Sequence, residues 1–167
     1  MRPAPTPPAL PPGHAAGQTW RSMMAEAFDE ACLAAQEGEI PIGAALFDAK
    51  GELLARARNR NISLCDPSAH AEILCLREAG AMLRNHRLTG SVLAVTLEPC
   101  LMCVGALLHA RVAGILFAAA DPKAGALTSN LDGANLPFAN HRPWVIQGVL
   151  AEDCSALLKR FFLARRK

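Results

Sequence analysis

Long hydrophobic runs and tyrosine are both absent from this sequence of 167 residues. No apolar stretch approaches the roughly 18 residues that a membrane-spanning helix needs, so we expect no membrane segment. The N-terminus also lacks a basic region followed by an apolar one, which excludes a typical secretory signal. Together these absences predict a cytoplasmic protein.

Basic residues are missing from Ser22 to Ala49, a stretch that contains six acidic residues. In contrast, the last nine residues, KRFFLARRK, contain five basic residues and no acid. The net charge of +2 is too small for a strongly basic nucleic-acid binder, but it hides this basic C-terminal end.

Six cysteines in a reducing compartment do not indicate a framework of disulfides. Metal ligation and buried packing are the alternatives. Cys32, Cys75 and Cys154 lie on apolar helical faces and are predicted to be packed thiols. Cys65 precedes a candidate site, and the sequence assigns it no role.

The hydrophobic periodicity predicts one domain over residues 19–167, after a disordered Pro- and Ala-rich extension over residues 1–18. Helices are predicted at 20–38, 69–83, 100–110 and 152–166, and strands at 40–48, 52–59, 91–97, 114–119 and 144–150. Strands interleaved with helices in this order are typical of a three-layer α/β/α domain with a central mixed sheet of about five strands.

The stretch TLEPCLMCVGA, residues 96–106, places Cys100 and Cys103 on one face of the first turn of a helix. Alone, this pair could be a redox pair, part of a structural zinc site or part of a catalytic metal site. The stretch DPSAHAE, residues 66–72, supplies His70 as a third ligand at the start of another helix. His70 and Glu72 would diverge by about 200° around a long helix, and they converge only if the helix points its first turn at the metal.

Three nitrogen and sulfur ligands leave the fourth position of zinc open to water, which is typical of a catalytic site. Glu72 is then the candidate general acid and base. A structural site would instead need a closing fourth ligand, for which the candidates are Cys65, Cys75, His86 and His109.

His-Ala-Glu followed by Pro-Cys-Leu-Met-Cys resembles the H-x-E…P-C-x-x-C pattern of zinc-dependent nucleobase deaminases. The stretches GEIPIGAALF, DPSAHAEILCLREAG, NHRLTGSVLAVTLEPCLMCVGALLHARV, ADPKAGA and GVLAEDCSALLKRFFLARRK resemble the bacterial tRNA-specific adenosine deaminases. These enzymes belong to the cytidine/deoxycytidylate deaminase superfamily. The resemblance covers roughly Met24 to Lys167.

The resemblance implies a homodimer that hydrolytically converts the wobble adenosine, position 34, of a tRNA anticodon loop to inosine, with an arginine tRNA as the expected substrate. It implies one zinc per chain on His70, Cys100 and Cys103, with Glu72 as the proton carrier. It further implies that Asn59 contacts the target nucleoside and that Asp121 positions the anticodon. The chain departs from the family pattern at Ala120 and at Pro143-Trp144.

The basic C-terminal helix adds Phe162, Arg165 and Arg166 as candidates for stacking on bases and neutralising phosphates. His141, in a polar loop beside Asn140, is a further candidate for a substrate contact. The apolar helix that begins at Cys100 and the helix before it predict a surface shared in an isologous dimer.

Two other functions stay open at this stage. One is a deaminase of a free base or nucleotide, which shares the zinc motif but needs no basic tail. The other is a zinc-binding partner without activity, against which the intact Glu72 argues.

Overall fold

The computed structural model describes residues 3–165, which form a five-stranded sheet covered by helices. The helices are α1 (Trp20–Gln36), α2 (Ala71–Leu83), α3 (Leu101–Ala110) and α4 (Ala151–Arg165), with short 3-10 helices η1 (His14–Ala16) and η2 (Gly133–Asn135). The strands are β1 (Gly43–Phe47), β2 (Leu53–Arg58), β3 (Val92–Leu97), β4 (Gly114–Ala119) and β5 (Trp144–Gln147). The predicted order of helices and strands and the three-layer α/β class are confirmed.

The sheet is mixed and runs in the order β2-β1-β3-β4-β5. β1 is antiparallel to β2 and β3, whereas β3, β4 and β5 are parallel to one another. Because Gly43 pairs with Arg58 while Ala44 pairs with Val95, β2 ends at the same edge of the sheet as β3. β4 ends there too, since Leu97 pairs with Ala119. We call this edge the carboxyl edge and the opposite one the amino edge.

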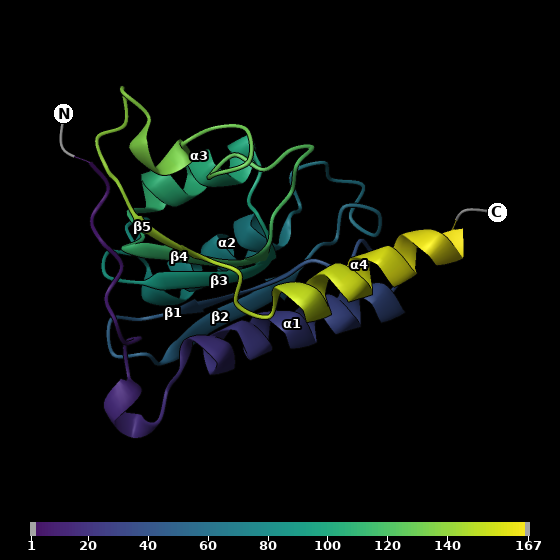
Figure 1. Ribbon diagram of the computed structural model, residues 1–167, viewed down its shortest axis with the longest axis horizontal. Helices are drawn as coiled ribbons and strands as arrows, with labels where there is room; N and C mark the ends of the chain where they lie inside the picture. Colours follow the sequence, from purple (N-terminus) through teal and green to yellow (C-terminus); the bar gives the residue numbers. More distant parts are fainter. Residues whose placement is uncertain (1–2, 166–167) are drawn as a thin grey trace.

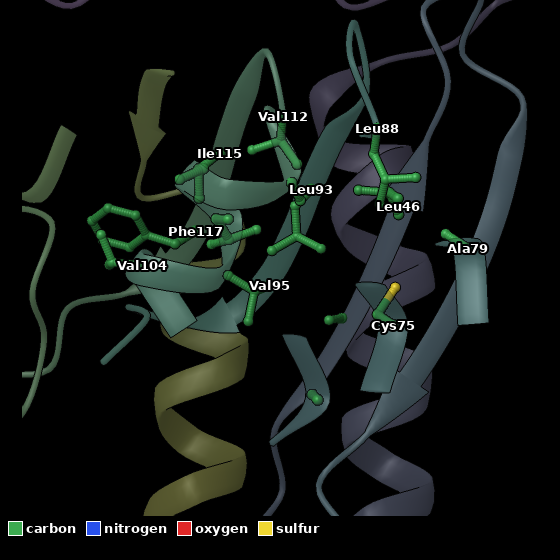
Figure 2. Close-up of a cluster of buried hydrophobic side chains, with 14 of the residues drawn as sticks. Leu46, Cys75, Ala79, Leu88, Leu93, Val95, Val104, Val112, Ile115 and Phe117 are labelled. Atoms are coloured by element: carbon green, nitrogen blue, oxygen red, sulfur yellow. The ribbon is translucent and has the colours of Figure 1, made fainter. Parts of the chain in front are cut away.

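Helices cover both faces of the sheet, with α2 and α3 on one side and α1 and α4 on the other (Figure 1). Successive side chains of a strand point to opposite faces of the sheet. Each strand therefore contributes side chains to the two hydrophobic cores, one on either face. In β3, Leu93 and Val95 lie in the core beneath α2 and α3 (Figure 2), while Val92 and Ala94 lie in the core with α1. No helix of residues 3–165 has both the length and the apolar character required to cross a membrane.

α1 packs closely against the first strand because residue 43 is a glycine. A Cβ at Gly43 would lie 2.1 Å from the carbonyl oxygen of Ala27 and 2.5 Å from the amide nitrogen of Ala31. Backbone atoms cannot move aside as a flexible side chain can. Glycine therefore sets the distance between α1 and the sheet.

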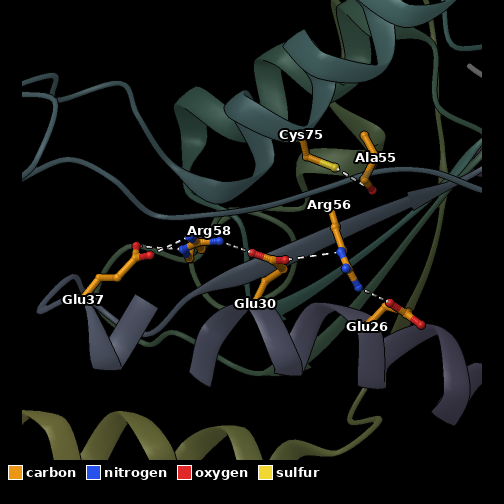
Figure 3. A network of polar contacts seen from close by, with 7 residues as sticks. All are labelled: Glu26, Glu30, Glu37, Ala55, Arg56, Arg58 and Cys75. Carbon is orange, nitrogen blue, oxygen red and sulfur yellow. Dashed lines mark hydrogen bonds and ion pairs between the residues drawn. The ribbon is translucent and has the colours of Figure 1, made fainter. Parts of the chain in front are cut away.

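An ion-pair ladder joins α1 to β2 (Figure 3). Arg58 donates to both carboxylate oxygens of Glu37, at 2.6 and 2.8 Å, and to buried Glu30 at 2.8 Å. Arg56 pairs with Glu30 and Glu26 at 3.4 and 3.0 Å. The hydrogen bonds from Arg58 lower the pKa of Glu37. Glu30 therefore has two cationic partners that compensate for its burial.

The N-terminal segment 3–18 follows the domain from η2 to the β1–β2 turn (Figure 1). The amide of Ala4 donates to Asn135 Oδ1 at 2.6 Å, and Pro11 is buried. A Cβ at Gly13 would lie 2.8 Å from the carbonyl oxygen of Lys50. The predicted disorder of residues 1–18 stays a prediction, and residues 1–2 lie outside the described part of the chain. Proline can bury its ring in an irregular segment, because it has no N–H that needs a partner.

The Pro143-Trp144 departure lies at the amino edge, where β5 begins. The ring of Trp144 packs edge-on against Trp20 with centroids 5.6 Å apart, and it fills the space that a Cβ at Gly114 would need. Trp144 is only 8% exposed. Trp144, one of the two residues at which the chain departs from the family pattern here, therefore contributes to the core.

Candidate metal centre and active site

Two of the strands that end at the carboxyl edge lead into helices whose N-termini meet. β2 leads through Asn59 and a loop to His70, the N-cap of α2. β3 leads through Glu98 and Pro99 to Cys100, the N-cap of α3. Cys103 lies in the first turn of α3, on the same side as Cys100. The helix ends therefore bring three metal-binding side chains together.

The three ligand atoms have the spacing of a tetrahedral metal site. His70 Nδ1 lies 3.7 Å from Cys100 Sγ and 3.5 Å from Cys103 Sγ, and the two sulfurs are 3.7 Å apart. Tetrahedral zinc with Zn–S bonds of about 2.3 Å and Zn–N bonds of about 2.05 Å requires an S···S distance of about 3.8 Å and an S···N distance of about 3.6 Å. The residues present therefore fit zinc without rearrangement.

No described residue supplies a fourth ligand. Among residues 3–165, the group of nearby His, Cys, Asp and Glu ligand atoms contains His70, Cys100 and Cys103 alone. The thiol of Cys75 contacts the carbonyl of Ala55 at 3.4 Å (Figure 3). Cys65 is exposed, and its sulfur lies 3.7 Å from a backbone carbonyl of its own loop. His86 and His109 line an outer groove between α2 and α3. The geometry favours an open, catalytic type of site over a closed structural one.

The surroundings of the thiols favour ionisation of Cys100. Hydrogen bonds with Cys103 and His70 lower the pKa of the Cys100 thiol to about 3. The pKa of Cys103 is raised by its hydrogen bond with Cys100 and by burial. The pKa of His70 is also raised, because His70 has a hydrogen bond of its own with Cys100. A lowered thiol pKa favours the thiolate form that binds a divalent cation.

Glu72 lies beside the metal group without belonging to it. It is 3% exposed and occupies the first turn of α2, and burial raises its pKa. His70 has an extended backbone (φ −74°, ψ 150°) as the N-cap, so the 200° separation expected along a continuous helix does not apply. His70 and Glu72 therefore both lie at the N-terminal end of α2. A buried carboxylate that binds no metal can exchange protons with the site.

Asn59 is buried at 2% exposure and caps α2 from outside the helix. The Oδ1 of Asn59 accepts the backbone N–H of Ala71 at 2.8 Å. The backbone N–H of Asn59 donates to the carbonyl of Ile42 at 3.0 Å. Within residues 3–165 its Nδ2 makes no hydrogen bond. One end of the amide is thus fixed next to His70, while the other can donate.

A loop over residues 121–129, called the 121–129 loop below, wraps around the carboxylate of Glu98. Oε1 accepts the backbone N–H groups of Leu127, Thr128 and Ser129 at 3.0, 2.8 and 2.9 Å. Oε2 accepts the N–H of Asp121 at 3.1 Å. Burial by itself raises the pKa of Glu98, but the hydrogen bonds from Ser129, Thr128 and Asp121 outweigh it and lower the pKa to about 2. Asp121 is thereby placed at the carboxyl edge, directly after exposed Ala120.

Glu39 plays a similar part for the other loop at this edge. It is 2% exposed and accepts the N–H groups of Ile62 and Ser63 at 3.1 and 2.7 Å. Sequence reasoning missed both Glu39 and Glu98 as residues that shape the site. For Glu98 the sequence did contain a signal, because this acidic residue stands directly before Pro-Cys at the end of an apolar strand.

The C-terminal helix lies near the 121–129 loop. Phe162 is 46% exposed and lines a groove of about 570 Å³ together with Lys123 and Lys159. The guanidinium of Arg165 lies 4.1 Å from the ring centroid of Phe161 and donates to the carbonyl of Gly38 at 2.5 Å. Arg166 lies outside the described residues.

The structure does not bring His141 to the metal group. Its Nε2 lies 2.6 Å from the carbonyl oxygen of Val112, which precedes the start of β4 at the amino edge. The six residues of β4 span about 20 Å between the two edges. His141 therefore lies away from the metal group of its own chain, and its contact with the substrate stays a prediction.

The fold and an open His-Cys-Cys group beside a non-ligand glutamate define the class of zinc-dependent deaminases. The family model for the cytidine and deoxycytidylate deaminase zinc-binding region matches residues 18–119. The tRNA-specific adenosine deaminase of Haemophilus influenzae is 44% identical over 145 residues, covering 87% of this chain and 84% of the relative. That of Bacillus subtilis is 43% identical over 144 residues, covering 86% and 89%.

Solved structures agree with these relatives. A structure from a study of A-to-I editing by tRNA:A34 deaminases has a TM-score of 0.79 and 39% identity, covering 82% of this chain and 99% of the other. Guanine deaminase from Nitrosomonas europaea has a TM-score of 0.68 and 25% identity, covering 84% and 83%. The chain belongs to the zinc-binding cytidine and deoxycytidylate deaminase family and, within it, to the tRNA-specific adenosine deaminases.

The site predicts one zinc per chain, which is lost when a ligand is removed. In His70→Ala, Cys100→Ala and Cys103→Ala, zinc should fall to background and the Tm by about 10 °C or more, because metal binding is coupled to folding. Glu72→Gln should keep one zinc per chain. Elemental analysis and thermal unfolding measure both quantities, and equal zinc loss in Glu72→Gln would make Glu72 a ligand.

Proposed function

We propose that this protein converts adenosine at the wobble position, 34, of a tRNA anticodon to inosine by hydrolytic deamination. The observation that carries the proposal is the convergence of three zinc ligands with a buried glutamate that is not a ligand. Relatives that are 43% and 44% identical over most of both chains, and are named for this activity, support the choice of substrate.

Zinc bound by His70, Cys100 and Cys103 would lower the pKa of a water molecule from 15.7 to about 7 and would thus supply a nucleophile at neutral pH. Glu72 would accept one proton from this water and pass it to N1 of the adenine, and it would then carry the proton of the new C6 hydroxyl to the departing amino group. A C6–O bond forms, the C6–N6 bond breaks, ammonia leaves, and inosine remains. Burial raises the pKa of Glu72 toward the range in which one group can both accept and donate a proton.

The free Nδ2 of Asn59 supports its predicted contact with the target nucleoside. Its Oδ1 is held by the N–H of Ala71, so the amide cannot flip without losing that hydrogen bond. An anticodon-loop base is already single-stranded, and the enzyme has only to unstack it into the pocket.

Incubation of the purified protein with an arginine tRNA carrying adenosine 34 should yield inosine at that position. Glu72→Gln should lower kcat about a thousandfold while zinc content stays at the wild-type value, because general acid–base catalysis contributes 10²–10⁴-fold. Inosine is read by sequencing of the tRNA. Deamination of free guanine with no inosine in tRNA would favour a free-base deaminase, and no activity on either substrate would favour an inactive zinc protein.

We propose that RNA contacts extend from the metal site over the 121–129 loop to α4. Lys123, Lys159 and exposed Phe162 share one groove, which offers both positive charge and a stacking surface. Arg165 is already engaged with Gly38, so Lys123 and Lys159 are the sharper test of phosphate contact. The roles of Arg165 and Arg166 toward RNA stay predictions.

Replacing Lys123 and Lys159 together with alanine should weaken tRNA binding and flatten its dependence on salt. Each lost phosphate contact should reduce the slope of log K against log salt by about 0.7. Lys50→Ala is the matched control, because Lys50 is an exposed lysine in the β1–β2 turn at the amino edge. An unchanged slope in the double variant would place the RNA elsewhere.

We propose a homodimer formed through α2 and α3. Their outer faces form an apolar groove of about 620 Å³, and large apolar side chains nearby are 40–57% exposed. These side chains are Met82, Leu83, Leu101 and Met102. Covering this surface with a second copy would remove it from water.

Sedimentation equilibrium at micromolar concentration should give twice the chain mass of 17.7 kDa. Ala106→Glu should shift the mass toward one chain, because Ala106 lines the groove and a buried unpaired charge is costly. Leu33→Glu on α1 is the control, since Leu33 is exposed on the opposite layer. A wild-type mass of one chain would contradict the dimer.

A further inference from the structure

Glu98 is a buried carboxylate whose partners are not cations. It is 2% exposed, and none of the ion pairs among residues 3–165 includes it. Four backbone N–H groups and the hydroxyls of Thr128 and Ser129 point at its two oxygens. A buried carboxylate without these donors would carry a large desolvation cost, so the loop and the carboxylate stabilise each other.

Glu98 holds both ends of the 121–129 loop. Its Oε2 accepts from Asp121 at the start, while Oε1 accepts from Leu127, Thr128 and Ser129 at the end. A loop tied at both ends to one carboxylate has little freedom to change shape.

The middle of the loop lies against the metal-binding helix. Gly125 forms an isolated β-bridge with Cys100, and the N–H of Ala126 donates to the carbonyl of Pro99 at 2.9 Å. A Cβ at Gly125 would lie 2.4 Å from the Glu98 carboxylate, so glycine is required for the loop to approach this closely.

The loop carries Asp121 and Lys123 on the side proposed to meet RNA. We propose that Glu98 is a positioning residue that fixes this loop, and with it the anticodon contacts, at a set distance from the metal ligand Cys100. This role rests on the proposed function. Glu98 touches neither substrate nor metal in this role and acts through the loop that it holds.

Glu98→Gln tests this role, because the amide keeps the size of the side chain but turns one acceptor oxygen into a donor facing N–H groups. Zinc should stay at one per chain. Hydrogen exchange at the amides of Leu127, Thr128 and Ser129 should accelerate at least about tenfold. KM for tRNA should rise about tenfold while kcat stays within about threefold, since the residues that do the chemistry are unchanged.

Glu30→Gln is the matched control for loss of a buried carboxylate. Glu30 is 5% exposed and pairs with Arg56 and Arg58 on the opposite face of the sheet. It should lower the Tm without changing KM for tRNA. If Glu98→Gln does not fold, Ser129→Ala removes one hydroxyl from the carboxylate and should raise KM about twofold to threefold with normal zinc.

A Glu98→Gln enzyme with lower Tm, normal exchange in the loop and unchanged KM would overturn the positioning role. Loss of zinc in Glu98→Gln would also overturn it, because the residue would then support the metal site. Wild-type enzyme that makes no inosine would overturn the proposed function, whereas an active wild type with an unaffected Glu98→Gln overturns the role of Glu98 alone.

Discussion

Two helix N-termini point at one position, where a nitrogen and two sulfurs lie within 3.7 Å of one another, and this convergence constrains the rest of the molecule. Helix N-termini carry unsatisfied N–H groups and partial positive charge, so they favour thiolates. The parallel ends of β2 and β3 supply the two approaches, and the sheet register sets their separation. Side chains from sequence positions thirty residues apart thereby meet with the spacing of tetrahedral zinc.

Among residues 3–165 four glutamates are buried, and the hydrogen-bond partners of each one decide its role. Glu72 has few donors, so burial raises its pKa and suits it to carry protons. Glu39 and Glu98 collect backbone N–H groups, which outweigh burial and lower their pKa values. Glu30 pairs with two arginines and joins α1 to β2. One residue type serves catalysis, loop geometry and packing, because the surrounding donors differ.

The two edges of the sheet have different tasks. The carboxyl edge carries the metal ligands, Asn59 and the loops held by Glu39 and Glu98. The amino edge carries Trp144, His141 and the contacts of the N-terminal segment, which close the core. Strand ends suit binding because the chain leaves the sheet there and can present polar groups without breaking the hydrogen bonds between neighbouring strands.

The order of helices and strands, the zinc ligands and the family follow from the amino-acid sequence alone. Hydrophobic periodicity is local, and Cys100 and Cys103 at i and i+3 share a helical face in any fold. The tertiary structure was needed to show that Glu98 and Glu39 hold the loops, since their hydrogen-bond partners lie 23 to 31 residues away. It also decided the position of His141, because a polar loop contains no signal for the edge to which it returns. A residue's type limits the interactions that it can make, whereas packing and sheet register select which of those interactions form.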